Sequence, residues 1–589
     1  MSVWRSRQGA AAALVVGVMV VWRAVLLSGS YFNQDDFYLS GRAYDVDLDL
    51  DFLFADTAGH VNPLQQLTYW LVANHAPYDW AVVGTFVLTL QTLTTIVLWH
   101  VLSRILPGRW ARVPLLAAFA WAPITLVTTL WWSAAMGLWP HLLCSLLAVL
   151  FLLRLRDGAG PAWLNGSVVV AASVVGLLWH ERAVLIAPVV LGVAVLTTDS
   201  PVGWRRPLAA LRRHWVLWTV HGALLAGYLV AHGRLTDVEG GSVSARESAR
   251  IGWSFVGENV LPGVLGGPWT ARLEGGAVQP PVWGTVVAIA VAVLLVGLLL
   301  WRGGPARRWA VAFFAAYVLA DLTLVLAGRG GFGRLIGLDP RYSADVIQAA
   351  VLCAALGLRR SRPAFGFARL RRSWPRGRTI GVVGTTAVYL VACGFGTAAL
   401  VPHFQNKADR AYVTEIRERL AQDPRQTLVD DLVPAEIVLP LVGDDSLLSR
   451  VLAPLPESPV FGQPTYFLRT VAEDGELVAA EIDGGIESEH ARRDDACGYR
   501  VTDDGAVVRF PVDLGGDLLL QVGYFTNEEA VVEVAVGPWR TEFLARPGPN
   551  DVWVPVPDLG TGFDRVRLSV SGSTTVCVPS VLAGRAARP

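Results

Sequence analysis

The stretch AAAALVVGVMVVWRAVLLS, residues 10–28, is long and apolar enough to cross the hydrocarbon core of a membrane as one helix. It is followed almost at once by YFNQDDFYLSGRAY, residues 31–44. Here two adjacent carboxylates, Asp35 and Asp36, lie between aromatic residues that suit a lipid–water boundary. Arg5 and Arg7 precede the run but no small-residue cleavage site follows it, so we expect a retained first helix rather than a cleaved signal.

The composition of the whole chain agrees with that first run. Of its 589 residues, 53% are hydrophobic and only 17% are charged, which is too apolar for an ordinary soluble protein. With residues 10–28, the runs able to cross about 30 Å of hydrocarbon number about eleven. The others occupy 79–103, 113–130, 137–153, 165–180, 182–197, 215–232, 281–301, 309–327, 345–358 and 379–400. We therefore expect a polytopic α-helical membrane protein in a lipid bilayer.

The arginines indicate how the spans are oriented, because cytoplasmic loops carry an excess of positive charge. The most basic connection is LRRSRPAFGFARLRRSWPRGR, residues 358–378. The other alternate connections contain Arg104, Arg109, Arg112, Arg154, Arg156, Arg205, Arg206, Arg212, Arg213, Arg302, Arg307 and Arg308. These loops are predicted to be cytoplasmic. The N-terminus is then inside, and an odd number of spans leaves the C-terminal region outside.

The predicted outer connections, 29–78, 233–280 and 328–344, are long and either acidic or glycine-rich. The inner connections are too short for a nucleotide-binding domain, and the chain has neither GxxxxGK[ST] nor GxGxxG in a strand–turn–helix context. The formal net charge is zero, which does not indicate a nucleic-acid partner. We therefore expect chemistry on the outer face, without a soluble nucleotide-activated donor.

After the membrane region, 1–400, the pattern changes twice. Residues 401–494 mix a helical segment with a short α/β connector. Residues 495–589 contain short alternating runs separated by Gly, Asp, Asn and Pro, which predict an antiparallel β-sandwich of jelly-roll type. Two interpretations of this domain are open, carbohydrate binding and a purely structural role. Cys497 and Cys577 lie in this tail and are candidates for a disulfide.

The first outer loop holds the clearest candidates for chemistry. A fixed carboxylate pair at the end of a membrane helix is a candidate functional site, so we assign catalysis to Asp35 and Asp36, against the alternative of interfacial hydration. The run Asp45, Asp47, Asp49 and Asp51 is either a divalent-cation site or, as we favour, a solvated loop face. His60 is a candidate for orienting an acceptor or the carboxylates, with a structural role as the alternative.

The acidic pair beyond the first span, the GHVNP element around His60, the many spans and the external β domain resemble the GT-C class of polyprenol-phosphate-sugar-dependent glycosyltransferases. That class includes protein O-mannosyltransferases, aminoarabinose transferases and the arabinofuranosyltransferases of mycolate-bearing bacteria. The resemblance covers the architecture of residues 1–400 and rests on few residues in detail. The family usually has an Asp-Glu or Asp-Asp pair; here it is Asp35–Asp36, and the match does not decide which is the base.

The resemblance implies a donor sugar on a polyprenyl phosphate in the outer leaflet and a hydroxyl acceptor on a glycan or glycoprotein. One carboxylate takes the acceptor proton as the hydroxyl attacks the anomeric carbon, which inverts that centre. The lipid phosphate leaves as an anion, so the site needs a cation. Neither a cofactor nor a metal is expected, and the implied location is a bacterial plasma membrane.

Two outer segments offer that cation. In GLDPRYSAD, residues 337–345, Arg341 and Tyr342 precede a span, and arginine can grip phosphate with two parallel hydrogen bonds. An Arg-Tyr here also resembles what GT-C enzymes place near the lipid phosphate. The alternative is a boundary arginine paired with Asp339 or Asp345.

The second segment is LLWHERAVLIAP, residues 177–188, where His180, Glu181 and Arg182 interrupt an apolar hairpin at its outer edge. They are predicted either to serve the lipid-phosphate site or to be polar punctuation at the interface. Arg329 and Arg334, in AGRGGFGRLIG, are weaker candidates for the same role.

Two other function classes are open. A transporter or flippase of a lipid-linked glycan predicts internal repeats and polar residues at the bilayer midplane, and we find no convincing repeat. A non-catalytic membrane protein whose sandwich binds cell-wall glycan is the other alternative. The sequence does not specify the sugar, the acceptor or the oligomeric state.

Overall fold

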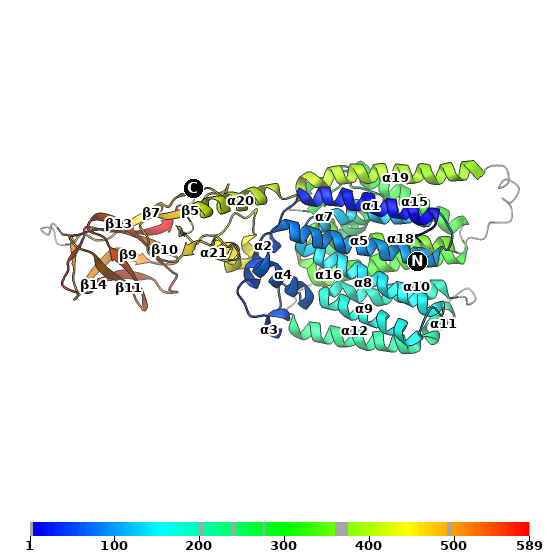
Figure 1. Cartoon of the computed structure of the whole chain (residues 1–589), viewed down its shortest axis with the longest axis horizontal. Helices are drawn as coiled ribbons and strands as arrows, with labels where there is room; N and C mark the ends of the chain where they lie inside the picture. The colour runs from blue at the N-terminus through cyan, green and yellow to red at the C-terminus, as the bar shows by residue number, and fades with distance from the viewer. Residues whose placement is uncertain are drawn as a thin grey trace. The chain divides into compact units, whose positions relative to one another are not determined.

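The computed structural model describes residues 4–198, 205–236, 243–274, 277–302, 304–359, 375–423, 425–491 and 497–587. The chain divides into two compact units, a mainly helical one and a largely β-stranded one that we call the tail (Figure 1). The helical unit comprises Met1–Asp36 and Asp45–Asn406, and the tail comprises Phe37–Tyr44 and Lys407–Pro589. The predicted basic connection 358–378 lies largely outside the described residues.

Nine helical segments of the described residues are long and apolar enough to cross a membrane. They contain all or most of α1 Arg7–Ser28, α5 Trp80–Ile105, α6 Arg112–Ala120 with α7 Leu126–Thr129, α8 Trp132–Arg156, α9 Ala162–Trp179, α12 Trp215–Leu235, α15 Val282–Arg302, α16 Pro305–Arg329 and α19 Pro375–Phe404. Two further apolar helices, α10 Ile186–Thr197 and α18 Val346–Arg359, have 12 and 14 residues, fewer than the roughly 20 that a span requires. The chain is therefore a multi-pass membrane protein.

The predicted span 113–130 is not one straight helix. It breaks between α6 and α7 at a 3₁₀ turn, η1 Pro123–Thr125, because Pro123 has no N–H to donate. The buried side chain of Arg23 on α1 donates to the carbonyl of Ala122 at 3.2 Å and to the Thr125 hydroxyl at 3.0 Å. This arginine therefore links α1 to the break between α6 and α7.

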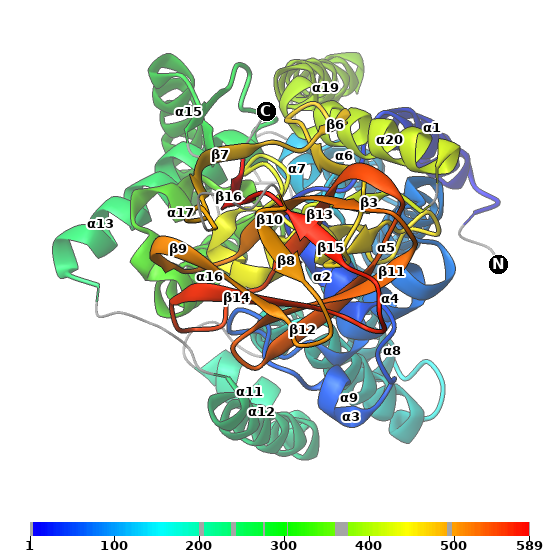
Figure 2. The same cartoon turned by 90° about the vertical axis from the view of Figure 1, so that its left-hand side faces the viewer.

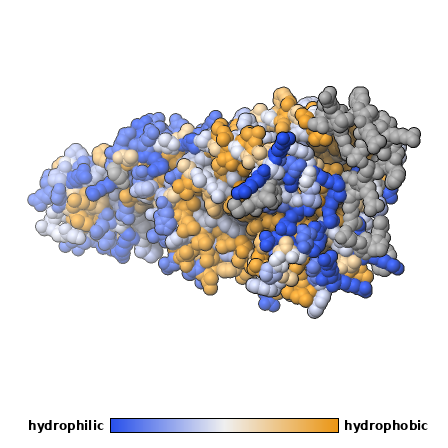
Figure 3. Space-filling model, turned by 45° about the vertical axis from the view of Figure 1, so that its right-hand side comes forward, coloured by the Kyte–Doolittle hydropathy of each residue, from blue (hydrophilic) through white to orange (hydrophobic). Residues whose placement is uncertain are grey.

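The helices differ in how much of their surface is buried. Trp132 and Trp139 on α8 are fully buried, and this helix packs against α5, α9 and α10. In contrast, Val293, Leu294 and Trp301 on α15 are exposed. Figure 3 shows such apolar side chains gathered over the helical unit on the face in view. Exposed apolar faces on helices of this length suit contact with lipid tails.

The connections between helices meet at one end of the bundle. Arg329 at the end of α16 donates to the carbonyl of Ala58 at 2.7 Å, and His60 Nδ1 lies 2.8 Å from Glu181 Oε1. Asn259 Nδ2 donates to the carbonyl of Gly337 at 3.1 Å. Parts of the predicted outer loops 29–78, 233–280 and 328–344 thus share this end with the turn after α9.

The tail is built from helix and strand. After α20 Lys407–Gln422, a small mixed sheet orders its strands β4-β3-β5-β6, namely Val460–Phe461, Thr427–Leu428, Leu468–Val471 and Leu477–Ala479. Two antiparallel sheets follow, and their strands can be traced in Figure 2. One contains β7 Ile482–Glu487, β8 Tyr499–Val501, β10 Leu518–Thr526, β13 Gly548–Val556, β15 Val576–Val578 and β16 Val581–Ala586. The other contains β9 Ala506–Leu514, β11 Ala530–Val536, β12 Trp539–Ala545 and β14 Phe563–Val570.

The two antiparallel sheets share one apolar core. On β11, Val532, Val534 and Val536 are buried whereas Val531 is exposed, the alternation expected when one sheet face packs and the other is solvated. β7 begins before residue 495, where the sequence placed a boundary, and pairs with β16. The first strand of this region therefore precedes the predicted start of the sandwich.

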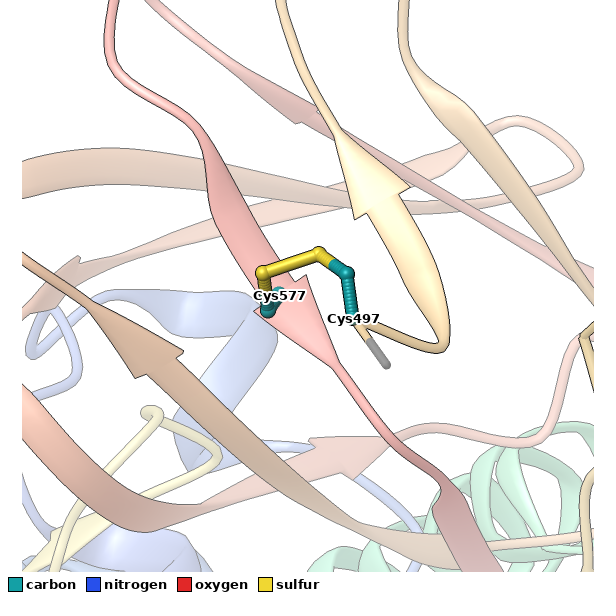
Figure 4. Close-up of a disulfide and its surroundings, with 2 residues drawn as sticks. All are labelled: Cys497 and Cys577. Carbon is teal, nitrogen blue, oxygen red and sulfur yellow. A yellow bond between two sulfur atoms is a disulfide. The ribbon is translucent and has the colours of Figure 1, made fainter. Parts of the chain in front are cut away.

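A disulfide joins Cys497 to Cys577 in the tail, as Figure 4 shows. These are the two cysteines that the sequence singled out for pairing, and they are separated by 80 residues. In the chain-entropy model a loop of that length contributes about 4 to 5 kcal/mol to stability. The other cysteines of the chain, Cys144, Cys353 and Cys393, are free and buried.

Gly41 offers a test of packing inside the tail unit. It lies on the helix α2 Asp35–Ala43, and a Cβ there would come within 2.4 Å of the carbonyl oxygen of Arg450 on α21 Leu448–Leu452. We expect Gly41→Ala to destabilise the tail by about 1–3 kcal/mol, because the backbone must shift to relieve the overlap. Thermal unfolding of the purified protein and protease resistance of the tail measure this. Gly17→Ala on α1, where nothing lies within 4 Å, is the control and should not lower stability.

Candidate active site

The acidic pair forms the first two residues of α2, and its two side chains have different surroundings. Asp36 is fully buried in the helical unit. Its Oδ1 accepts the N–H of Ser133 at 2.8 Å and its Oδ2 accepts the N–H of Asn33 at 3.0 Å. Because Ser133 is in the first turn of α8, Asp36 satisfies an unpaired amide at the positive end of that helix.

The hydrogen bonds of Asp36 fit a structural anchor. Burial raises the pKa of Asp36 to about 8, although the amides of Ser133 and Asn33 oppose this rise by stabilising the carboxylate. Both oxygens are engaged by backbone groups. Asp36 thus connects the start of α2 to the start of α8.

Asp35 is the more open of the two carboxylates. Its side chain is 39% exposed, and its Oδ2 lies 3.8 Å from Arg341 Nη1. Surrounding protein raises the pKa of Asp35, while the positive field of Arg341, with contributions from His60 and Arg329, opposes that rise. The first outer loop and the 337–345 segment, 300 residues apart in sequence, therefore present a carboxylate and a guanidinium to each other.

Arg341 is held in place by its own loop and by α8. It lies in the short 3₁₀ helix η5 Pro340–Tyr342, where the Asp339 side chain accepts its backbone N–H at 2.9 Å. The same carboxylate also accepts a hydrogen bond from the Nε–H of Arg341 at 2.7 Å and lies 2.6 Å from its Nη2. The guanidinium carbon stacks 3.8 Å from the ring centre of Trp131, just before α8. Arg341 thus forms the ion pair with Asp339 that the sequence left as an alternative, and its Nη1 is directed to Asp35.

Asn259 fixes the loop that carries Arg341, and sequence reasoning missed it. It lies in the π-helix Ser254–Val260 (η3), a rare conformation that is often found at functional sites. Its Nδ2 donates to the carbonyls of Gly337 and Asp339, and its Oδ1 accepts the Ser343 hydroxyl at 2.9 Å. A polar Asn between the apolar residues of SFVGENVLPG was the available signal.

Arg182 lies in the turn η2 Glu181–Leu185, and its guanidinium points into the protein. Its Nη2 lies 2.7 Å from Asp321 Oδ1 on α16, and its Nη1 lies 3.4 Å from Asp345 Oδ1. Asp321 is an acidic residue within the apolar helix α16. The structure shows that its partner is Arg182.

His60 and Glu181 form a polar chain beside Asp35. The guanidinium of Arg329 contacts His60 Nε2, and because a guanidinium only donates, this nitrogen accepts. The other ring nitrogen of His60, Nδ1, lies 2.8 Å from Glu181 Oε1. Burial lowers the pKa of the adjacent His180 to about 4, and its Nδ1 accepts the N–H of Arg182 at 3.2 Å.

The structure thus sorts the predicted site residues into groups. Asp35, Arg341 and Tyr342 share one neighbourhood, since the ring of Tyr342 lies 5.8 Å from the Arg341 guanidinium. His60 and Glu181 join it through Arg329. Asp36, His180 and Arg182 engage backbone groups. Among the described residues, no three His, Cys, Asp or Glu side chains gather as a metal site, and this includes the run from Asp45 to Asp51.

Fold and site together define a multi-pass membrane protein with a carboxylate and an arginine at the loop-bearing end of its bundle. The chain is structurally similar to GT-C polyprenyl-phosphate-sugar transferases. One is ArnT from Cupriavidus metallidurans bound to undecaprenyl phosphate, with TM-score 0.43 and 13% identity over 79% of this chain and 94% of ArnT. Another is a mutant of the mycobacterial arabinofuranosyltransferase AftD, with TM-score 0.36 and 11% identity over 97% of this chain.

The chain spans 61% of the length of the AftD chain. No family model matches the sequence, and no curated protein matches it. Because the similarities to solved structures are low, the function proposed below rests on the chain's own residues.

Proposed function

We propose that the chain is an inverting glycosyltransferase that moves a sugar from a polyprenyl-phosphate donor to a hydroxyl group of a glycan or glycoprotein. The observation that carries this proposal is the approach of Asp35 to Arg341 Nη1, 3.8 Å apart, at the loop-bearing end of a membrane bundle. A carboxylate supplies the base for a hydroxyl nucleophile, and an arginine supplies the cation for a phosphate leaving group. A sugar carried on a lipid phosphate is the donor that a membrane bundle can reach.

The reaction is a single displacement. The acceptor hydroxyl loses its proton to Asp35 as its oxygen forms a bond to the anomeric carbon. The bond between that carbon and the phosphate oxygen breaks at the same time, and the phosphate leaves with the electron pair. Arg341 meets the growing negative charge, and attack from the face opposite the phosphate inverts the anomeric centre.

We assign the base to Asp35 and an anchoring role to Asp36. Both oxygens of Asp36 accept backbone amides and the side chain is buried, so an acceptor hydroxyl cannot reach it without breaking the contact to α8. Asp35 has an exposed side chain beside the cation. The sequence did not decide which of the two aspartates is the base, and we propose that it is Asp35.

We place the site and the tail outside the cytoplasm of a bacterial plasma membrane. The arginine-rich short connections support this orientation, and the Cys497–Cys577 disulfide adds an independent reason. Structural disulfides form in oxidising compartments and are rare in the cytosol of mesophiles.

Purified protein in liposomes tests the proposal, with a polyprenyl-phosphate-linked labelled sugar and a mixture of hydroxyl acceptors prepared from bacterial envelope glycans. We expect the label to move to the water-soluble glycan and free polyprenyl phosphate to accumulate in equal amount. Inversion at the anomeric carbon, measured by NMR of the product, completes the test. If the labelled lipid crosses the bilayer intact and no glycan is labelled, the protein is a transporter and the proposal is wrong.

A further inference from the structure

Arg182 lies at the centre of a buried ionic network. The side chains of Asp321 and Asp345 are 0% exposed, and Arg182 bridges them with Nη2 at 2.7 Å and Nη1 at 3.4 Å. Taking three charges out of water is unfavourable unless their contacts offset the lost hydration. A buried group of this kind calls for an explanation beyond stability.

The same guanidinium binds the backbone of the loop proposed to grip phosphate. Its Nη1 donates to the carbonyl of Arg341 at 3.1 Å, and its Nη2 donates to the carbonyl of Tyr342. These carbonyls close the short helix η5, where the last carbonyls have no partner within the helix. Arg182 therefore supplies the donors that hold residues 341 and 342 in one conformation.

The far side of the network is fixed to α16. Tyr317 lies on α16 one helical turn before Asp321. Its hydroxyl donates a hydrogen bond to Asp345 Oδ2 at 2.7 Å. His141 on α8 also faces Asp345, with Nε2 3.8 Å from Oδ2. The helices α16 and α8 and the loop that carries Arg341 thus meet around Arg182, next to the carboxylates of Asp321 and Asp345.

We infer that Arg182 is the positioning residue of the phosphate site, holding the backbone of Arg341 so that Nη1 faces Asp35. The inference rests on the proposed function and deepens it, because Arg182 acts through Arg341 and does not itself touch the lipid phosphate. Both of its terminal nitrogens are already engaged, each by one carboxylate and one carbonyl. Lysine carries its donors on one nitrogen and cannot span these four acceptors.

The test compares Arg182→Lys with Arg341→Ala and with the double variant. We expect Arg182→Lys to raise KM for the donor and the Kd for polyprenyl phosphate about tenfold or more, with a smaller fall in kcat. If Arg182 acts through Arg341, then Arg182→Lys should change the Kd less than twofold in the Arg341→Ala background. Additive effects would mean that Arg182 contacts the ligand directly, and would overturn the inference.

A milder variant covers the case in which Arg182→Lys does not fold. Tyr317→Phe removes only the hydroxyl that holds Asp345, and we expect a two- to fivefold rise in the same Kd. The matched control is Arg112→Lys, a buried arginine of the bundle that stacks on Trp99, and its Kd should equal that of the native protein. If Arg182→Lys does not fold, an unchanged Kd in a folded Tyr317→Phe refutes the inference; if Arg182→Lys folds, its own unchanged Kd refutes it.

The binding and transfer readouts separate the two proposals. If the native protein transfers sugar but Arg182→Lys binds and turns over donor normally, the inference fails and the glycosyltransferase stands. If the native protein transfers no sugar but binds polyprenyl phosphate through Arg341 and needs Arg182 for it, the inference stands and the proposed reaction fails.

Discussion

Asp35→Asn is expected to lower kcat for sugar transfer by about 10²- to 10⁴-fold, the contribution of a general base. An amide has nearly the shape of the carboxylate but cannot take the proton of the acceptor hydroxyl. Donor binding should change little, since the lipid phosphate is held by Arg341. Single-turnover transfer from a polyprenyl-phosphate sugar, together with a separate measurement of Kd for polyprenyl phosphate, distinguishes these two effects.

Asp36→Asn is the matched variant for this experiment. Its amide nitrogen would face the N–H of Asn33 or Ser133, so one backbone amide loses its acceptor at a cost of about 1–3 kcal/mol. We expect a lower melting temperature and a fall in kcat per folded molecule of less than tenfold. If Asp36→Asn abolished transfer and Asp35→Asn did not, the assignment of the base would be reversed.

The pH profile offers a second check on Asp35. Because the surrounding protein partly desolvates Asp35 and raises its pKa, while Arg341 opposes the rise, the base becomes ionised above the ordinary aspartate value of about 3.9. The rate should therefore fall on acidification through a pKa higher than that value. This acidic limb should be absent from the residual rate of Asp35→Asn.

Arg341→Gln is expected to have the second-largest effect, a fall in kcat/KM for the donor of about 10²- to 10³-fold, typical of losing one group that stabilises developing anionic charge. Both KM and kcat should suffer, because the guanidinium meets the phosphate before and during its departure. Arg341→Lys should recover only part of the loss, since one ammonium cannot serve Asp339 and a phosphate together in the same geometry.

Arg334→Gln is the control for Arg341. It removes an arginine from a neighbouring segment, whose guanidinium lies 3.5 Å from Glu258. Its donor kinetics should stay within about threefold of those of the native protein. Equal losses in Arg334→Gln and Arg341→Gln would show that the outer loops contribute only a general positive field, screened by salt.

Much of the helical unit follows from the sequence, because a span is specified locally. Nine of the predicted runs coincide with helical segments of the described residues long enough to span, since a helix satisfies its own backbone where water is absent, whereas the runs 182–197 and 345–358 contain helices of only 12 and 14 residues. The run 113–130 was predicted as one span, but it breaks at Pro123. Packing brings Arg23, from about 100 residues earlier in the chain, to this break.

In the tail, too, some strands are evident from their own sequence and others form because of the strand they pair with. Strands such as β11, with valines at alternate positions, are evident from the sequence. β12, WRTEFLA, has a weaker pattern, because only Phe543 and Ala545 are buried, Leu544 is exposed and the other residues are polar or half-exposed. It is a strand because its backbone pairs with the whole of β11, from Val536–Trp539 to Ala530–Ala545.

By itself the sequence determined that this is a membrane protein of many spans, with a carboxylate pair beyond the first span and arginines in distant loops. These features depend on hydrophobic length and residue type, which are properties of short segments. Only the tertiary structure decided that Asp35 meets Arg341, that Asp36 anchors α8, and that Arg182 turns inward to Asp321 and Asp345. Adjacent residues on a helix point about 100° apart, so their partners are chosen by what packs on each side.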